Sequence, residues 1–170
     1  MKRILILLII SISFIMETGA QQDTTALTKP GEKAPAFSCK YIDGKSFDLN
    51  KLHGKIIMIN FFATWCPACN LELPTLQKEV WEKYRDNPEF VLIIIGREHT
   101  DKELSDFAKS KNYSLPFAAD PKREIYNLYA TKYIPRNIVI DGDGKIIYQK
   151  SGFTSTEFAE IEKLIAKSLK

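Results

Sequence analysis

The chain is poor in the residues that build disulfide scaffolds and metal sites, because its 170 residues include only three cysteines and two histidines. Small secreted domains held together by disulfides carry far more cysteine, so that class of protein is excluded. Two of the cysteines form one C-x-x-C pair, and a zinc site would need two further ligands in a second paired spacing. The remaining candidates lack such a spacing, so we expect neither a metal nor another cofactor; they are Cys39, His53 and His99.

The chain also lacks a strong charge of either sign. Lys and Arg number 24 and Asp and Glu number 21, which gives a net charge of +3. No cluster of basic residues is interleaved with aromatic residues, so we expect no nucleic-acid partner. There is no internal repeat, and the length suits one compact domain.

No long apolar run is present that would securely span a membrane. The uncharged stretch from Ile4 to Met16 has thirteen residues, whereas a spanning helix needs about 20. Because Lys2 and Arg3 precede it and a small residue, Ala20, follows, residues 1–20 are predicted to be a cleaved secretory signal, with an uncleaved membrane anchor as the alternative. Residues 21–33 are predicted to be a linker and residues 34–170 the domain. We expect the protein in the periplasm or at the outer face of the cytoplasmic membrane.

Apolar runs alternate with helical patterns along the domain. Residues 55–63 and 90–95 are predicted buried strands, and hairpins are predicted around Asp43-Gly44 and around residues 141–144. Predicted helices span residues 66–84 with a kink at Pro74, 101–109, 122–130 and 155–170; the second and last begin with Thr-x-x-Glu caps. This order predicts an α/β fold with a central mixed sheet and helices on both faces.

The pair Cys66-Pro67-Ala68-Cys69 follows the first buried strand and opens the first helix. With Cys66 as the N-cap and Pro67 at the first helical position, the Cys66 sulfur faces free backbone N–H groups and the positive end of the helix dipole. This environment stabilises a thiolate, so Cys66 is predicted to attack a disulfide and Cys69 to resolve it. A purely structural disulfide is the weaker interpretation, since so small a loop adds little stability.

The strand "IIMINFFATW", the Cys66–Cys69 motif and the later segment "KYIPRNIVIDGDGKI" together resemble the thioredoxin superfamily, and within it the exported thiol-disulfide oxidoreductases of TlpA/ResA type. The resemblance covers about residues 31–168 and implies a thioredoxin-like fold. It also implies that Pro135 is cis and lies opposite the Cys66–Cys69 disulfide, and that the backbone of Ile134 pairs with a substrate strand. A trans proline that starts an edge strand is the alternative.

The resemblance also assigns a role to Glu72. Thioredoxin has a buried Asp six residues before its first cysteine, where this chain has Asn60, whereas the exported subfamily has Glu three residues after the second cysteine. Glu72 is one helical turn from Cys69, and a partly buried carboxyl there would have a raised pKa and accept the proton of Cys69. The alternative is a solvated glutamate.

These features imply an enzyme that exchanges disulfides with exported proteins. The resemblance implies a reductant, acting for example in cytochrome c maturation, that is recharged by a membrane thiol reductase; we expect a monomer. Trp65 is predicted to serve the partner surface, or else the core, whereas Cys39 is expected to be a buried free thiol and both histidines surface residues. The alternatives are a peroxiredoxin-like peroxidase, which would need Thr in place of Ala63, and a non-catalytic module that binds client proteins.

Overall fold

A computed structural model describes residues 23–169 of the chain. The signal or anchor predicted for residues 1–20 lies outside the described residues. Among the helices of residues 23–169, none is long and apolar enough to cross a membrane.

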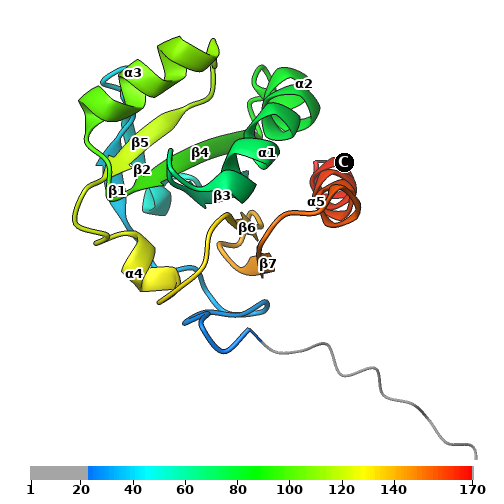
Figure 1. Ribbon diagram of the computed structural model, residues 1–170. Coiled ribbons are helices and arrows are strands. Elements are labelled where there is room, and N and C mark those ends of the chain that lie inside the picture. Colours follow the sequence, from blue (N-terminus) through cyan, green and yellow to red (C-terminus); the bar gives the residue numbers. More distant parts are fainter. Residues whose placement is uncertain (1–22, 170) are drawn as a thin grey trace, which may run out of the picture.

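A central sheet of five strands has the order β5-β4-β3-β6-β7 (Figure 1). Its parallel part contains β3, β4 and β5, whereas β6 runs antiparallel to β3 and β7 antiparallel to β6. This mixed sheet confirms the predicted α/β class. The strands are β3 (Ile56–Phe62), β4 (Phe90–Arg97), β5 (Phe117–Asp120), β6 (Arg136–Ile140) and β7 (Ile146–Ser151).

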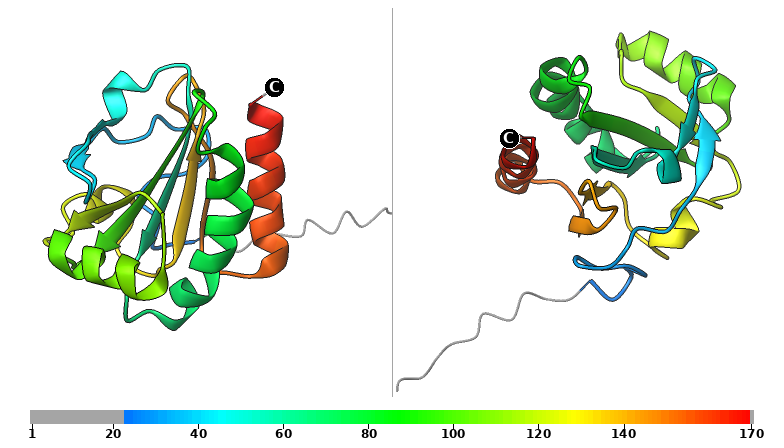
Figure 2. Two further views of the ribbon diagram at one scale, coloured as in Figure 1. Left: turned by 90° about the horizontal axis from the view of Figure 1, so that it is seen from above. Right: turned by 180° about the vertical axis from the view of Figure 1, so that it is seen from behind.

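Both faces of the sheet are covered (Figure 2). Alternate residues of β3 enter two apolar cores: Met58 and Phe62 pack on one side and Ile59 and Phe61 on the other. The first core is closed by α1 (Pro67–Leu76), α3 (Asp101–Lys111) and α5 (Ser155–Ser168). The second is closed mainly by the predicted hairpin of β1 (Ser38–Lys40) and β2 (Ser46–Asp48), the 3-10 turn η1 (Leu49–Lys51) and the short α4 (Tyr126–Tyr129).

The predicted helix over residues 66–84 is present, and its regular part ends soon after Pro74. Helix α1 passes into the π-helical segment η2 (Gln77–Trp81) and then into α2 (Glu82–Tyr84). Pro74 has no N–H to donate within the helix, so an irregular turn close behind it is expected. The first turn, which carries both cysteines, precedes this irregularity.

Two elements differ from the sequence analysis. Strand β5 was not predicted, because "FAAD" is too short and too rich in alanine to stand out as a strand; it forms by pairing with the edge of β4. The prediction that a helix begins at residue 122 is wrong, because Arg123 has the left-handed φ of 59° and cannot continue a right-handed helix. The carboxylate of Asp120 accepts hydrogen bonds from the backbone of Ile125 and Tyr126 instead, so only the short α4 forms.

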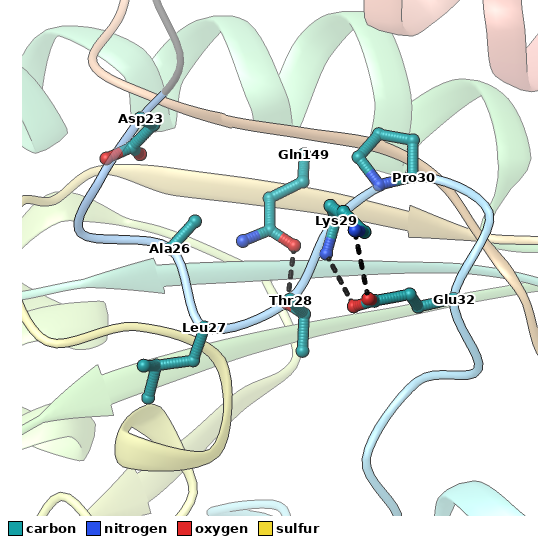
Figure 3. A pocket seen from close by; sticks show the side chains of 8 residues that line it. All are labelled: Asp23, Ala26, Leu27, Thr28, Lys29, Pro30, Glu32 and Gln149. Atoms are coloured by element: carbon teal, nitrogen blue, oxygen red, sulfur yellow. Dashed lines mark hydrogen bonds and ion pairs between the residues drawn. The ribbon is translucent and has the colours of Figure 1, made fainter.

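The segment from Asp23 to Lys33, predicted as a linker, contacts the domain. Asp23 forms an ion pair of 2.8 Å with the fully buried Arg136, the residue after Pro135. Further along, the Thr28 hydroxyl donates a 2.6 Å hydrogen bond to Gln149 of β7, across a hollow that Figure 3 shows from close by. The hollow includes none of the predicted site residues; its lining is Asp23, Ala26, Leu27, Thr28, Lys29, Pro30, Glu32 and Gln149.

Candidate active site

Cys66 and Cys69 form a disulfide at the carboxyl end of β3, where α1 begins. Cys66 is the N-cap residue with an extended backbone, Pro67 follows at the first helical position, and the Cys69 backbone N–H donates to the Cys66 sulfur over 3.2 Å. Cys66 is 5% exposed and Cys69 is fully buried. The geometry therefore offers the Cys66 sulfur both the helix N-terminus and the better access to a partner.

The loop before β6 lies against this disulfide. The peptide bond between Ile134 and Pro135 is cis, as the resemblance implies. The carbonyl oxygen of Ile134 is 3.7 Å from the Cys66 sulfur, so this backbone directly borders the more accessible sulfur of the disulfide. Two hydrogen bonds to its backbone hold this loop in place: the Tyr126 hydroxyl donates to the Tyr133 carbonyl, and Arg136 donates to the Lys132 carbonyl.

Glu72 lies inside the protein, one helical turn from Cys69, and is 1% exposed. Its carboxylate accepts hydrogen bonds from the side-chain amides of Asn60 on β3 and Asn137 on β6, two residues directly opposite in the sheet. Burial raises the pKa of Glu72 to about 7, although both hydrogen bonds lower it in part. Glu72 is therefore not a solvated surface residue, and its carboxyl group exchanges protons near neutral pH.

Asn137 was missed by the sequence analysis, and Asn60 was considered only as a substitute for Asp. The one feature of the sequence that points to Asn137 is its polar side chain at the start of the apolar run "IVI", where a buried strand is expected. Only the register of β3 against β6 brings the two amides to the same carboxylate.

Trp65 lies at the surface beside the disulfide, with 58% of its area exposed, so it is not a core residue. Its ring lies 5.4 Å from the guanidinium carbon of Arg97, which is also 5.1 Å from the ring of Tyr126. Tyr133, next to Ile134, is 63% exposed. Large exposed aromatic residues are therefore the chain neighbours of both Cys66 and Ile134, a composition typical of protein-binding surfaces.

The prediction that His99 lies at the surface is wrong. His99 is 5% exposed, and its Nε2 atom accepts a 3.0 Å hydrogen bond from the backbone N–H of Thr64, two residues before Cys66. The error arose because His99 follows β4 in a segment that reads as a loop, and only the parallel pairing of β3 with β4 brings it to the turn before Cys66. His53 is exposed, as predicted.

The third cysteine lies on β1 and makes no disulfide. Burial, together with the smaller effect of the Asp120 and Asp101 charges, raises the pKa of the Cys39 thiol to about 11. Such a thiol is a poor nucleophile at neutral pH. Among residues 23–169, no group of three or more His, Cys, Asp or Glu is arranged to hold a metal ion.

Comparison with known proteins agrees with this geometry. Residues 29–165 match the Redoxin family. The chain is 31% identical over 160 residues to the thiol-disulfide oxidoreductase ResA of Bacillus anthracis, which covers 93% of this chain and 91% of the relative. It is 26% identical to ResA of Bacillus subtilis, with 91% of this chain and 84% of the relative covered.

Solved structures share the fold. A candidate protein disulfide isomerase from Bacteroides thetaiotaomicron has a TM-score of 0.82 and 36% identity, with 85% of this chain and 92% of that chain covered. A thiol:disulfide interchange protein of the thioredoxin family from Chlorobium tepidum has a TM-score of 0.69 and 26% identity, with coverages of 84% and 99%. The chain therefore belongs to the redoxin family, and is a thioredoxin-fold thiol-disulfide oxidoreductase of the TlpA/ResA-like group.

Proposed function

We propose that the protein reduces disulfides of exported proteins, with Cys66 as the attacking thiolate and Cys69 as the resolving thiol. The observation that carries this proposal is the position of Cys66: it caps α1 and lies 3.7 Å from the Ile134 carbonyl oxygen, with the buried Glu72 one turn beyond Cys69. These features supply an activated nucleophile, a substrate backbone contact and a proton acceptor in one place.

The reaction begins with the reduced protein. The Cys66 thiolate attacks one sulfur of a client disulfide, forming a mixed disulfide and releasing the other client sulfur as a thiolate. Cys69 gives its proton toward the Glu72 carboxylate and attacks the Cys66 sulfur. The second client sulfur leaves, and the Cys66–Cys69 disulfide remains. Two electrons have passed from the protein to its client.

The proposed substrate surface consists of Trp65 and Ile134, with the buried Pro135 next to Ile134 in the chain. The partly buried Ile134 would offer backbone hydrogen bonds to an extended client segment beside its cysteine, as in strand addition. Trp65, with 58% of its surface exposed, would cover the client next to the reacting sulfurs. Because this contact uses the backbone of Ile134 and the ring of Trp65, it would accept client segments of different sequence.

The direction and the partners rest on the resemblance of the sequence to the TlpA/ResA group. That resemblance implies a reductant, and cytochrome c haem-attachment cysteines would be one class of client. A membrane thiol reductase would recharge the disulfide. The N-terminal sequence supports export, with the domain at the periplasmic or outer side of the membrane, either free or tethered. The protein would act as a monomer.

The test is reduction of insulin disulfides in the presence of a thiol reductant. The wild-type protein is expected to accelerate insulin precipitation, and Cys66→Ala is expected to abolish the acceleration. Cys39→Ala is the matched control and is expected to retain full activity, because that thiol has a pKa of about 11. Full activity in Cys66→Ala would contradict the proposal.

A further inference from the structure

His99 holds the turn that presents the attacking cysteine. The backbone N–H of Thr64 donates to Nε2 of His99 over 3.0 Å, and the Thr64 carbonyl accepts a 2.9 Å hydrogen bond from the side chain of Asn70 on α1. Thr64 is therefore fixed at both its N–H and its carbonyl group. Cys66 follows Thr64 by two residues, so the two hydrogen bonds of Thr64 fix the position of the Cys66 sulfur relative to the N-terminus of α1.

The segment that carries His99 makes a second contact with the turn before Cys66. Arg97, two residues before His99, lies 5.4 Å from the Trp65 ring. Glu98, between them, has the left-handed φ of 67°, which is uncommon for a residue other than glycine. Such a backbone is typical of functional sites, where the surrounding structure maintains it. Arg97 at the end of β4 and His99 just after it thus contact the two residues that directly precede Cys66.

The bond to Thr64 defines the state of the imidazole. A backbone N–H is always a donor, so Nε2 must be the unprotonated acceptor and the ring proton must lie on Nδ1. The imidazolium form carries protons on both nitrogens, so its Nε2–H would face the Thr64 N–H, and two donors would oppose one another. Protonation of His99 therefore breaks its hydrogen bond to the Thr64 backbone, and leaves the Thr64 hydroxyl, 3.4 Å from Nε2, as the one Thr64 group that can accept the new proton.

The surroundings of the ring favour the neutral form. Burial lowers the pKa of His99 below its usual range, and the carboxylates of Glu103 and Glu98 oppose that shift only in part. Glu103, on α3, lies 3.8 Å from Nδ1, and its carboxylate is also engaged by the backbone and hydroxyl of Thr100. From β3, the uncharged Phe62 is the ring neighbour, with centroids 6.3 Å apart.

We propose that neutral His99 is a positioning residue for Cys66, and that its protonation in acid releases the turn at Thr64 and lowers the reactivity of the Cys66 thiolate. The inference rests on the proposed role of Cys66 as the nucleophile. Released from the turn, the sulfur is held less closely over the N-terminus of α1, so its thiolate is less stabilised. The reduced protein would then become less reactive as the pH falls, beyond the loss caused by titration of Cys66 itself.

The test compares the rate at which iodoacetamide alkylates reduced Cys66, measured by mass spectrometry from one pH unit below the imidazole pKa of His99 up to pH 8, in four proteins. These are the wild type, His99→Gln, His99→Leu and His53→Gln. Glutamine keeps an acceptor for Thr64 without titrating, leucine removes the acceptor, and His53 is the exposed histidine and serves as the control. The imidazole pKa of His99 is measured independently by NMR.

One pH unit below that imidazole pKa, about nine-tenths of the rings are protonated, and we expect the wild type to react at least about threefold more slowly than His99→Gln. At pH 7.5 these two proteins should converge, whereas His99→Leu should be slower and His53→Gln should follow the wild type throughout. Superimposable profiles for the wild type and His99→Gln would overturn the inference, even if His99→Leu fails to fold. The readout needs no client protein, so failure of the proposed client reduction would be seen separately in the insulin assay.

Discussion

The side-chain amide of Asn137 on β6 donates a hydrogen bond to the carboxylate of Glu72 on α1. Asn137 follows Pro135 by two residues, and Glu72 follows Cys69 by three, so this contact joins the two segments of the site. Asn60 adds a 2.8 Å bond from β3 to the same carboxylate. Glu72 is thus fixed by two strands while it gains or loses a proton.

Replacing Glu72 with Gln removes the proton acceptor proposed for Cys69. We expect the rate at which Cys69 resolves a mixed disulfide at pH 7 to fall about 100-fold, the lower range for loss of a positioned general base. The measurement is release of a client from a preformed mixed disulfide at Cys66, followed from pH 5 to 9. Glu82→Gln, on the exposed side of α2, is the control. An unchanged rate and pH profile in Glu72→Gln would argue against the proposed role.

Glu72 also makes stability depend on pH. Its pKa is about 7 in the folded protein and about 4.3 in an unfolded chain. Between these values the folded state binds more protons, so the free energy of unfolding falls as the pH rises from about 4.5 to 7. The full shift corresponds to about 4 kcal/mol. Chemical denaturation of the oxidised protein at pH 5 and pH 8 measures the larger part of it, and Glu72→Gln should lose most of that difference; an equal difference in both proteins would contradict this.

The ion pair of Asp23 with Arg136 predicts the opposite dependence. Burial raises the pKa of Asp23, but hydrogen bonds from Thr25 and Arg136 outweigh it and bring the pKa to about 2. Stability from this pair is complete above about pH 4 and is lost as the pH falls toward 2.

Because Arg136 is fully buried, Asp23→Asn leaves a buried charge without its partner. We expect a loss on the order of 2 kcal/mol at pH 7, less than for two fully buried ions since Asp23 is partly exposed. Urea denaturation measures it, with the exposed Asp86→Asn as the control. Equal stability in both variants would show that the Asp23–Arg136 ion pair contributes nothing to the stability of the domain.

Trp65→Ala is expected to weaken client binding without changing the chemistry of the pair. Removing so large an exposed aromatic residue beside the reacting sulfurs should raise KM for a protein disulfide about tenfold or more. The rate of reaction with a small disulfide should change much less. Leu27→Ala removes a side chain of similar exposure, 56%, from the N-terminal segment, and should leave both values unchanged. Equal effects of Trp65→Ala on large and small disulfides would place Trp65 in a structural role.

Features that depend on neighbouring residues were predictable from the sequence. The buried strand β3, the N-cap at Cys66, the Thr100–Glu103 capping box and the position of Glu72 one turn from Cys69 all follow from spacings of a few residues. The cis bond before Pro135 required the resemblance, because local sequence gives no sign of it.

Features that depend on sheet register were not predictable. Asn137 reaches Glu72, and His99 reaches Thr64, only because β6 and β4 flank β3 in the observed alignment. Similarly, Asp23 lies 113 positions from Arg136 in sequence, and the polar character of its segment suggested a linker. Contacts over such separations leave no periodic pattern in one sequence.

An equilibrium redox titration of the Cys66–Cys69 pair tests the central claim most directly. The oxidised and reduced fractions would be followed by thiol alkylation and by the fluorescence of Trp65, which lies next to Cys66. A reductant of exported proteins should show one two-electron transition near the thioredoxin value of about −270 mV. A transition near about −120 mV, the value of a strong disulfide donor, would contradict the proposed direction of electron flow.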